Sequence, residues 1–166
     1  MHNVNELPSI LLAEDEEADV LLLRRALKEA DVQNPVHVAS DGQAAMDFLA
    51  QQRTSLDGRL PALIILDLKM PRRNGMDVLK WMQDQPVLCG VPVIVFSSSA
   101  HRSDIEQAYA LGANGFVVKP PSLAERLEFA RLIKQWLKFN LPPLVCTEGF
   151  RAAQSAHAGR NFSERP

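Results

Sequence analysis

Short apolar runs alternate with longer segments of helical period along most of the chain. The short runs are rich in Val, Ile and Leu and predict β-strands, while the longer segments predict amphipathic helices. The expected strands span residues 9–13, 36–39, 62–66, 91–96 and 116–118. The expected helices span residues 18–30, 43–51, 76–84, 103–111 and 123–139, separated by loops of which 53–61 is the longest polar one. This alternation predicts an α/β fold with a doubly wound, five-stranded parallel sheet in the order 2-1-3-4-5.

Four of the five expected strands end in reactive polar side chains. These side chains are Glu14 and Asp15 after the first strand, Asp67 after the third, Ser97 after the fourth and Lys119 after the fifth. In an open parallel sheet, ligands bind beyond the carboxyl ends of the strands. We therefore expect the four strand ends to converge on one site.

The three acidic residues at these strand ends predict a metal site. Clustered carboxylates repel one another unless a cation neutralises them. Their hard oxygen donors suit Mg²⁺ better than zinc. The expected direct ligands are one oxygen each from Asp15 and Asp67 and the backbone carbonyl of Lys69, with Glu14 acting through water.

Such a site can transfer a phosphoryl group to a carboxylate. Asp67 would be the nucleophile, and the product would be an acyl phosphate. The metal and the Lys119 ammonium would balance charge on the equatorial oxygens of the transferred group. The Ser97 hydroxyl would donate to one of those oxygens.

Composition and charge narrow the function classes further. The chain has 166 residues, 46% of them hydrophobic, and a net charge of -2, which fits one soluble domain without a basic field for nucleic acid or an anionic membrane. No apolar stretch is long enough to span a membrane, and the N-terminus carries no secretion signal. Cys89 and Cys146 lack metal or redox spacing, so reduced thiols and a cytoplasmic location are expected.

The site residues, in this order and spacing, resemble the receiver domain of bacterial two-component response regulators over about residues 8–139. The motifs that carry the likeness are the acidic pair, Asp67 with Met70-Pro71 and Gly75, Ser97, and Lys119-Pro120. The resemblance implies a flavodoxin-like receiver fold, phosphate acceptance from a histidine kinase, Mg²⁺ dependence, and a switch through Ser97 and the aromatic Phe116.

A narrower likeness is to the stand-alone regulators paired with phytochrome histidine kinases. Its motifs are Glu14-Asp15 followed by Ala18-Asp19-Val20, Asp41-Gly42 followed by residues 45–49, and Trp136-Leu137. This likeness implies a bacteriophytochrome as the kinase partner. Lys69 replaces the Asn common in that group and Asn74 replaces the usual Asp, so the lifetime of the aspartyl phosphate does not carry over.

The chain divides into an expected receiver domain, residues 1–140, and a C-terminal extension, residues 141–166. The helix expected at 123–139 has more apolar surface than one sheet face needs, which predicts an interface. We expect a homodimer through the fourth helix, the fifth strand, the fifth helix and the extension. Too few residues follow Phe139 for a DNA-binding domain, so output would pass through a partner protein or by onward phosphoryl transfer.

Three other functions compete with that of a signalling phosphoacceptor. Such a phosphoacceptor would not be an enzyme acting on a separate substrate, but it would catalyse its own Mg²⁺-dependent phosphorylation and dephosphorylation. Acid phosphatases and dehalogenases of related chemistry need an Asp two residues after the nucleophile, where this chain has Lys69. A nucleotide-binding protein needs a phosphate-cradling loop after the first strand, where Glu14 to Glu17 would repel phosphate. A phosphorylation-independent docking module stays open, and it would tolerate loss of Asp67.

Several polar residues have simpler interpretations. Glu16, Glu17 and Asp19 are expected to be acids that favour the N-terminus of the first helix. Ser103 and Gly112 are expected to cap the fourth helix. The basic pair at residues 72–73 is expected to be solvated or to face a kinase.

Overall fold

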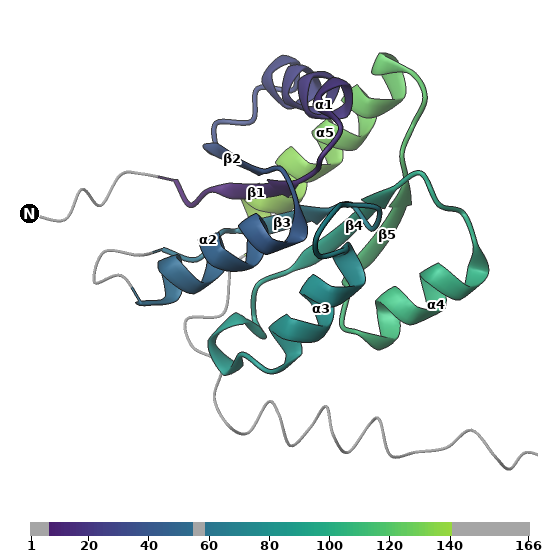
Figure 1. The fold of residues 1–166 in the computed structure, drawn as a ribbon. Coiled ribbons are helices and arrows are strands. Elements are labelled where there is room, and N and C mark those ends of the chain that lie inside the picture. The colour runs from purple at the N-terminus through teal and green to yellow at the C-terminus, as the bar shows by residue number, and fades with distance from the viewer. Residues whose placement is uncertain (1–6, 55–58, 141–166) are drawn as a thin grey trace, which may run out of the picture.

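The computed structural model describes residues 7–54 and 59–140. Within these residues, five parallel strands form one sheet in the order β2-β1-β3-β4-β5 (Figure 1). The strands are β1 (Ile10–Ala13), β2 (Val36–Ala39), β3 (Leu63–Leu66), β4 (Val93–Ser97) and β5 (Gly115–Val118). The helices are α1 (Glu17–Glu29), α2 (Gly42–Thr54), α3 (Gly75–Gln83), α4 (Arg102–Ala110) and α5 (Leu123–Phe139), with a short 3₁₀ helix η1 (Pro86–Leu88). The predicted fold class and strand order are confirmed.

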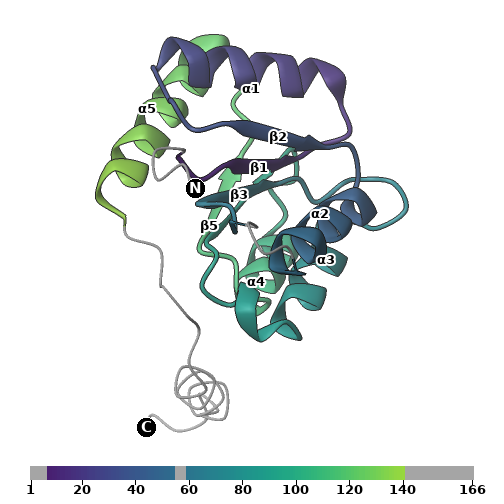
Figure 2. The same cartoon turned by 90° about the vertical axis from the view of Figure 1, so that its left-hand side faces the viewer.

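Helices cover both faces of the sheet (Figures 1 and 2). On one face, α1 and α5 pack together over alternate strand residues such as Leu12, Ile65 and Phe96. On the other face, α2, α3 and α4 cover the intervening residues, such as Leu11 and Ile64. Every residue of β1 and β3 is buried, as expected for strands that read as continuous apolar runs. This burial fixes the two central strands, whose ends carry the acidic residues.

The observed boundaries differ from the predicted ones by a few residues. Helix α2 continues through Thr54, so the loop predicted from residue 53 begins too early. The predicted Ser103 cap is wrong, because α4 begins at Arg102 after His101, which makes no side-chain cap. Gly112 follows the C-cap residue with a φ of 93°, a conformation that glycine adopts without a Cβ clash.

Two further predictions concern membrane spanning and the redox state of the cysteines. No helix in the described part of the chain is long and apolar enough to cross a membrane. Cys89, which follows η1, is disulfide-bonded, so the expectation of a reduced thiol is wrong at this residue. Spacing along the chain excludes only a local redox motif, and Cys146, the other cysteine of that expectation, lies outside the described residues.

Candidate functional site

The ends of β1 and β3 bring the predicted acidic residues together. Ala13 lies opposite Leu66 in the parallel register, and the Asp67 amide donates to the Ala13 carbonyl at 2.9 Å. Glu14 and Asp67 are nearly fully buried, while Asp15 is exposed. One carboxylate oxygen from each of the three lies within 4.8 Å of the others. The three carboxylates therefore form one cluster at the carboxyl edge of the sheet.

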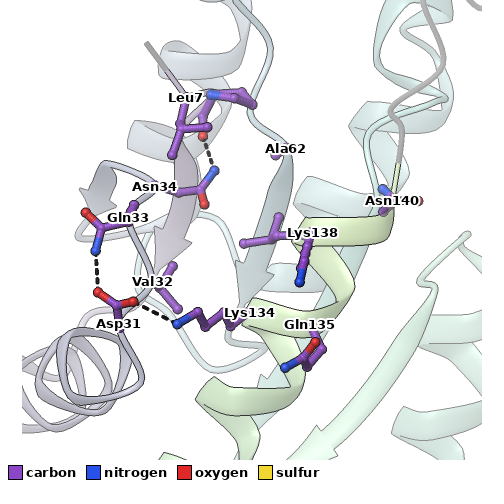
Figure 3. A pocket seen from close by; sticks show the side chains of 12 residues that line it. Leu7, Asp31, Val32, Gln33, Asn34, Ala62, Lys134, Gln135, Lys138 and Asn140 are labelled. Atoms are coloured by element: carbon purple, nitrogen blue, oxygen red, sulfur yellow. Dashed lines mark hydrogen bonds and ion pairs between the residues drawn. The ribbon is translucent and has the colours of Figure 1, made fainter. Parts of the chain in front are cut away.

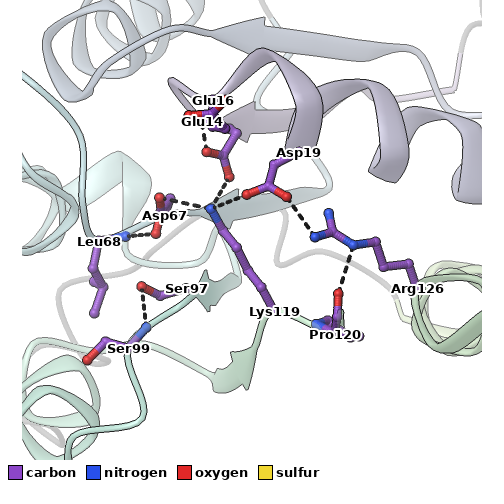
Figure 4. Close-up of polar contacts among 10 residues, drawn as sticks. All are labelled: Glu14, Glu16, Asp19, Asp67, Leu68, Ser97, Ser99, Lys119, Pro120 and Arg126. Atoms are coloured by element: carbon purple, nitrogen blue, oxygen red, sulfur yellow. Dashed lines mark hydrogen bonds and ion pairs between the residues drawn. The ribbon is translucent and has the colours of Figure 1, made fainter. Parts of the chain in front are cut away.

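Lys119 lies in the middle of this cluster (Figure 4). Its Nζ is 2.7 Å from Oε2 of Glu14, 2.9 Å from Oδ2 of Asp19 and 3.0 Å from Oδ2 of Asp67. The residue is held at the end of β5 because its amide donates to the carbonyl of Ser97, at the end of β4, at 2.8 Å. The structure thus brings Lys119 to Asp67, and it adds Asp19, which was predicted only as a helix-terminal acid.

Burial and pairing set the charges in the cluster. Burial raises the pKa of Glu14 above its usual value, although Lys119 beside it acts in the opposite direction. Burial alone would lower the pKa of Lys119, but bonds to Glu14 and Asp19 and the charge of Asp67 outweigh it and raise the pKa. Burial also opposes ionisation of Asp19, yet bonds from Lys119 and Arg126 lower its pKa. Lys119 and Asp19 are therefore charged at neutral pH.

The charge balance favours a cation. Four carboxylates, those of Glu14, Asp15, Asp19 and Asp67, face two cationic side chains, Lys119 and Arg126 of α5. With all four carboxylates ionised, these six side chains together carry a net charge of -2. Hard carboxylate oxygens with surplus negative charge fit a divalent metal ion. The side chain of Lys69 is exposed nearby in the same loop as Asp67.

The loop after β3 is shaped around Asp67. The Leu68 amide donates to Oδ1 of Asp67 at 2.7 Å, which fixes the carboxylate. Gly75, the first residue of α3, donates its amide to the Leu68 carbonyl at 3.1 Å. A Cβ atom on Gly75 would lie 2.3 Å from the Asp67 carbonyl oxygen, so only glycine lets α3 begin this close to the site. Asn74 caps α3 by accepting from the amide of Asp77 at 2.9 Å.

The two predicted switch residues lie on adjacent strands. Ser97 is fully buried at the end of β4, and its Oγ accepts a long hydrogen bond of 3.4 Å from the Ser99 amide. Phe116 lies opposite Val95 in β5, is half-buried and packs against the core under α2, α3 and α4. Ser97 pairs with Val118, so Phe116 lies two residues further from the site along β5, and the coupling between Ser97 and Phe116 stays a prediction.

A second ion pair that the sequence did not reveal ties two loops of the same edge. Asp41 is buried, accepts from the Ala44 amide at 2.8 Å and pairs with the guanidinium of Arg72. The Gly42 amide donates to the Arg73 carbonyl at 3.0 Å in the same contact. Arg72 and Arg73 are exposed, as expected of a solvated pair, and the guanidinium of Arg72 in addition pairs with Asp41. No local spacing signals this pair, since its partners lie on different βα loops.

A cavity of about 460 Å³ lies at the opposite, amino-terminal edge of the sheet (Figure 3). It lies between the loop after α1 and the end of α5, where Asp31 pairs with Lys134 at 2.8 Å. None of the predicted site residues lines it. The carboxylate cluster and this cavity are therefore separate features.

Comparison with known proteins agrees with the fold. The family model for the response regulator receiver domain matches residues 10–131. The response regulator Rcp1 of Synechocystis sp. is 34% identical over 130 residues, which cover 78% of this chain and 88% of Rcp1.

Solved structures show the same relationship. The phosphorylated cyanobacterial phytochrome response regulator RcpA has a TM-score of 0.73 and 31% identity, covering 82% of this chain and 98% of RcpA. The Mn²⁺-bound form of Rcp1 has a TM-score of 0.73 and 33% identity, with coverages of 82% and 99%. RPA3017, a response regulator in red light signalling of R. palustris, has a TM-score of 0.75 and 29% identity, with coverages of 84% and 100%. With its five-stranded fold and acidic edge, this chain belongs to the response regulator receiver family and is related to the phytochrome response regulators.

Proposed function

We propose that this protein is a two-component response regulator that accepts a phosphoryl group on Asp67 from a histidine kinase and signals by a conformational switch to a partner. The observation that carries the proposal is the contact of 3.0 Å between Lys119 Nζ and Asp67 Oδ2 inside a cluster of carboxylates. A phosphoacceptor needs such an acid next to a fixed cation. Membership of the receiver family supports the same chemistry.

The chain's own residues suffice to describe the transfer. A carboxylate oxygen of Asp67 attacks the phosphorus atom while the bond to the donor imidazole nitrogen breaks, and the electron pair of that bond leaves with the imidazole. The Leu68 amide holds the attacking group in place through Oδ1. The Lys119 ammonium moves from carboxylate to phosphoryl oxygens, where it balances the negative charge. The buried Ser97 hydroxyl donates to another of these oxygens.

The residues also fit a Mg²⁺ ion. Carboxylate oxygens of Asp15 and Asp67 and the backbone carbonyl of Lys69 would bind it directly, and Glu14 would act through water. The net charge of -2 and the all-oxygen donor set support this assignment. When bound, the ion supplies positive charge to the transferred phosphoryl group. The relative Rcp1 has a Mn²⁺-bound form, which supports a divalent ion as a ligand of this protein.

The switch would use Ser97 and Phe116. Bonding of Ser97 to the phosphoryl group vacates space at the end of β4, and Phe116 rotates inward to fill it. Phe116 is half-buried at present, so inward rotation gains further apolar burial. We expect Phe116→Ala to weaken the dependence of partner binding on phosphorylation; partner affinities that respond to phosphorylation as in the wild type would disprove the coupling.

The face formed by α4, β5 and α5 is proposed as the homodimer interface. Its exposed large apolar side chains are Tyr109, Val118, Leu132, Trp136 and Phe139. Leu132 is 69% exposed and Phe139 is 74% exposed. Large apolar side chains exposed together on one face favour a protein interface. The proposed receiver unit, residues 1–140, would be joined in the dimer by the extension at 141–166, which lies outside the described residues. Sedimentation of the chain truncated after Asn140 tests the extension, since an unchanged dimer removes it from the interface.

Phosphotransfer profiling tests the function. Each purified histidine kinase of the source cell, phytochrome kinases included, is autophosphorylated and mixed with the wild type, Asp67→Asn or Asp84→Asn. Asp84 is an exposed acid at the end of α3, so Asp84→Asn controls for the loss of one charge. Fast transfer that needs Mg²⁺ and Asp67 but not Asp84 is expected.

The identity of the donor decides the finer assignment. Transfer from a phytochrome kinase would support a role in light signalling, the role that the relative RPA3017 has in red light. Transfer only from another kinase would support phosphorylation of Asp67 and would reject a phytochrome as the kinase partner. No transfer from any kinase would favour the alternative, a docking module that works without phosphorylation.

A further inference from the structure

Asp19 is shared between two cations. Its Oδ2 accepts from Lys119 Nζ at 2.9 Å, and its Oδ1 accepts from Nη2 of Arg126 at 2.6 Å (Figure 4). Asp19 lies in the first turn of α1 and Arg126 in the first turns of α5, two helices that pack against each other. The acid therefore links the site to the contact between α1 and α5.

Arg126 is built into the core with one donor unused. Its side chain is only 6% exposed, its Nε donates to the Pro120 carbonyl at 2.9 Å, and its guanidinium carbon lies 5.7 Å from the centre of the Phe96 ring. Its Nη1 is buried and has no hydrogen-bond partner in the described part of the chain. A buried unpaired donor costs stability, so this arrangement needs an explanation.

Lys119 and Arg126 share the two oxygens of Asp19. A guanidinium can donate two parallel bonds to one carboxylate, but here Arg126 donates only to Oδ1, while Oδ2 accepts from Lys119. The Lys119 ammonium has three N–H donors, and Glu14, Asp19 and Asp67 accept from it in the resting protein. A phosphoryl oxygen must displace one of these acceptors. We expect Asp19 to be the acceptor that is displaced, because its other partner, Arg126, has an N–H group at Nη1 that makes no hydrogen bond in the described part of the chain.

We propose that Asp19 and Arg126 are positioning residues for Lys119. In the resting protein, Asp19 holds the ammonium beside Asp67. When Lys119 bonds to the phosphoryl group, Oδ2 of Asp19 is released and Nη1 of Arg126 takes it, so that the pair becomes bidentate. This inference rests on the proposed phosphorylation of Asp67, and it goes beyond it by assigning a role to two residues outside the phosphoryl-binding set.

Arginine side-chain ¹⁵N NMR of the full chain tests the exchange. The probe is Mg²⁺ with beryllofluoride, which mimics a phosphoryl group on a carboxylate, and Arg126→Lys assigns the signals. Rotation about the Cζ–Nη bonds of Arg126 is expected to slow on loading of Asp67, and Asp67→Asn is expected to show no change. Backbone amide shifts around Asp67 report the loading independently.

The outcomes separate the two proposals. Loading of Asp67 with unchanged Arg126 signals would overturn the positioning role alone. If Asp67 neither loads nor accepts a phosphoryl group from any donor, the proposed function fails and this inference fails with it.

Phosphorylation kinetics supply a second test, which uses a double variant because the single variant could fail to fold. Asp19→Asn alone would leave Arg126 as an unpaired buried cation, whereas Asp19→Asn combined with Arg126→Met removes both charges. With phosphoramidate as donor, the maximal phosphorylation rate of the double variant is expected to fall about fivefold to tenfold. The phosphoramidate concentration that gives half the maximal rate is expected to stay constant, because neither Asp19 nor Arg126 touches the donor. Asp19→Glu, which keeps the charge, is expected to restore the rate to within about twofold of the wild type; a folded double variant with the wild-type rate would overturn the proposal.

Discussion

Alanine at position 75 would collide with the backbone that carries Asp67, the proposed phosphoacceptor. Its Cβ would lie 2.3 Å from the Asp67 carbonyl oxygen and 2.9 Å from the Leu68 Cα. Both contacts are with main-chain atoms, so no side-chain rotation relieves them and the loop after β3 must shift. We therefore expect Gly75→Ala to lower the stability and to displace Asp67.

The magnitude follows from two opposing effects. Overpacking of a well-packed site costs about 1–3 kcal/mol. Alanine favours the helix over glycine by at most about 1 kcal/mol. The main-chain collision places the cost at the upper end, so a net destabilisation of about 2 kcal/mol is expected. At about 2–4 °C per kcal/mol, the melting temperature should fall by about 4–8 °C.

Thermal unfolding followed by circular dichroism measures the effect, with phosphorylation by a small donor as the second readout. Gly115→Ala in β5 is the matched control, because its Cβ would meet the Ile94 side chain at an ordinary 3.7 Å. The control should melt at or slightly above the wild-type temperature. If Gly75→Ala melted with the wild type and were phosphorylated at the same rate, the reasoning from close approach would be refuted.

Three further predictions concern stability. Leu79→Ala, in the core under α3, should cost about 2–5 kcal/mol in urea unfolding; a loss below about 1 kcal/mol would contradict the packing described. Asn74→Ala removes the α3 cap and should cost about 1 kcal/mol, whereas equal unfolding midpoints would mean that the cap is unimportant. The Ala44 amide and Arg72 lower the pKa of Asp41 below its usual 3.8, so its ionised form stabilises the fold above that pH. The stability gap between wild type and Asp41→Asn should therefore shrink as the pH falls below about 4, and a constant gap would speak against the ion pair.

The fold and the carboxylate cluster could be predicted because both depend on local signals. Strands buried on both faces read as short apolar runs, and parallel strands place the residues that follow them at one edge. Glu14, Asp15, Asp67 and Lys119 each follow such a run directly, so their meeting was accessible from the sequence. The 3₁₀ helix η1 was not predicted, because three residues are too short for a periodic pattern.

The residues around this cluster could not be predicted for an equally physical reason. Asp19 is an acid in the first turn of a helix, where acids are favourable without any partner. Only the packing of α1 on α5 brings Arg126 to it, across 107 positions of sequence. Arg72, which pairs with Asp41, has a backbone φ of 62°. This conformation is uncommon for residues other than glycine, so the sequence does not predict it. Ion pairs between residues far apart in the sequence produce no periodic pattern from which they could be predicted.

The central place of β1 has a consequence for synthesis of the chain. Among the described strands, β1 is made first, and it pairs on both sides, with β2 and with β3, as Ile10 lies opposite Val36 and Leu63. Every pairing is parallel and needs a crossover helix, so the contacts join distant segments and form slowly. Until β3 leaves the ribosome, the nascent chain has an apolar strand with one unpaired edge, which is the state that chaperones protect. We expect the time taken to translate residues 14–66 to set how long that edge is exposed.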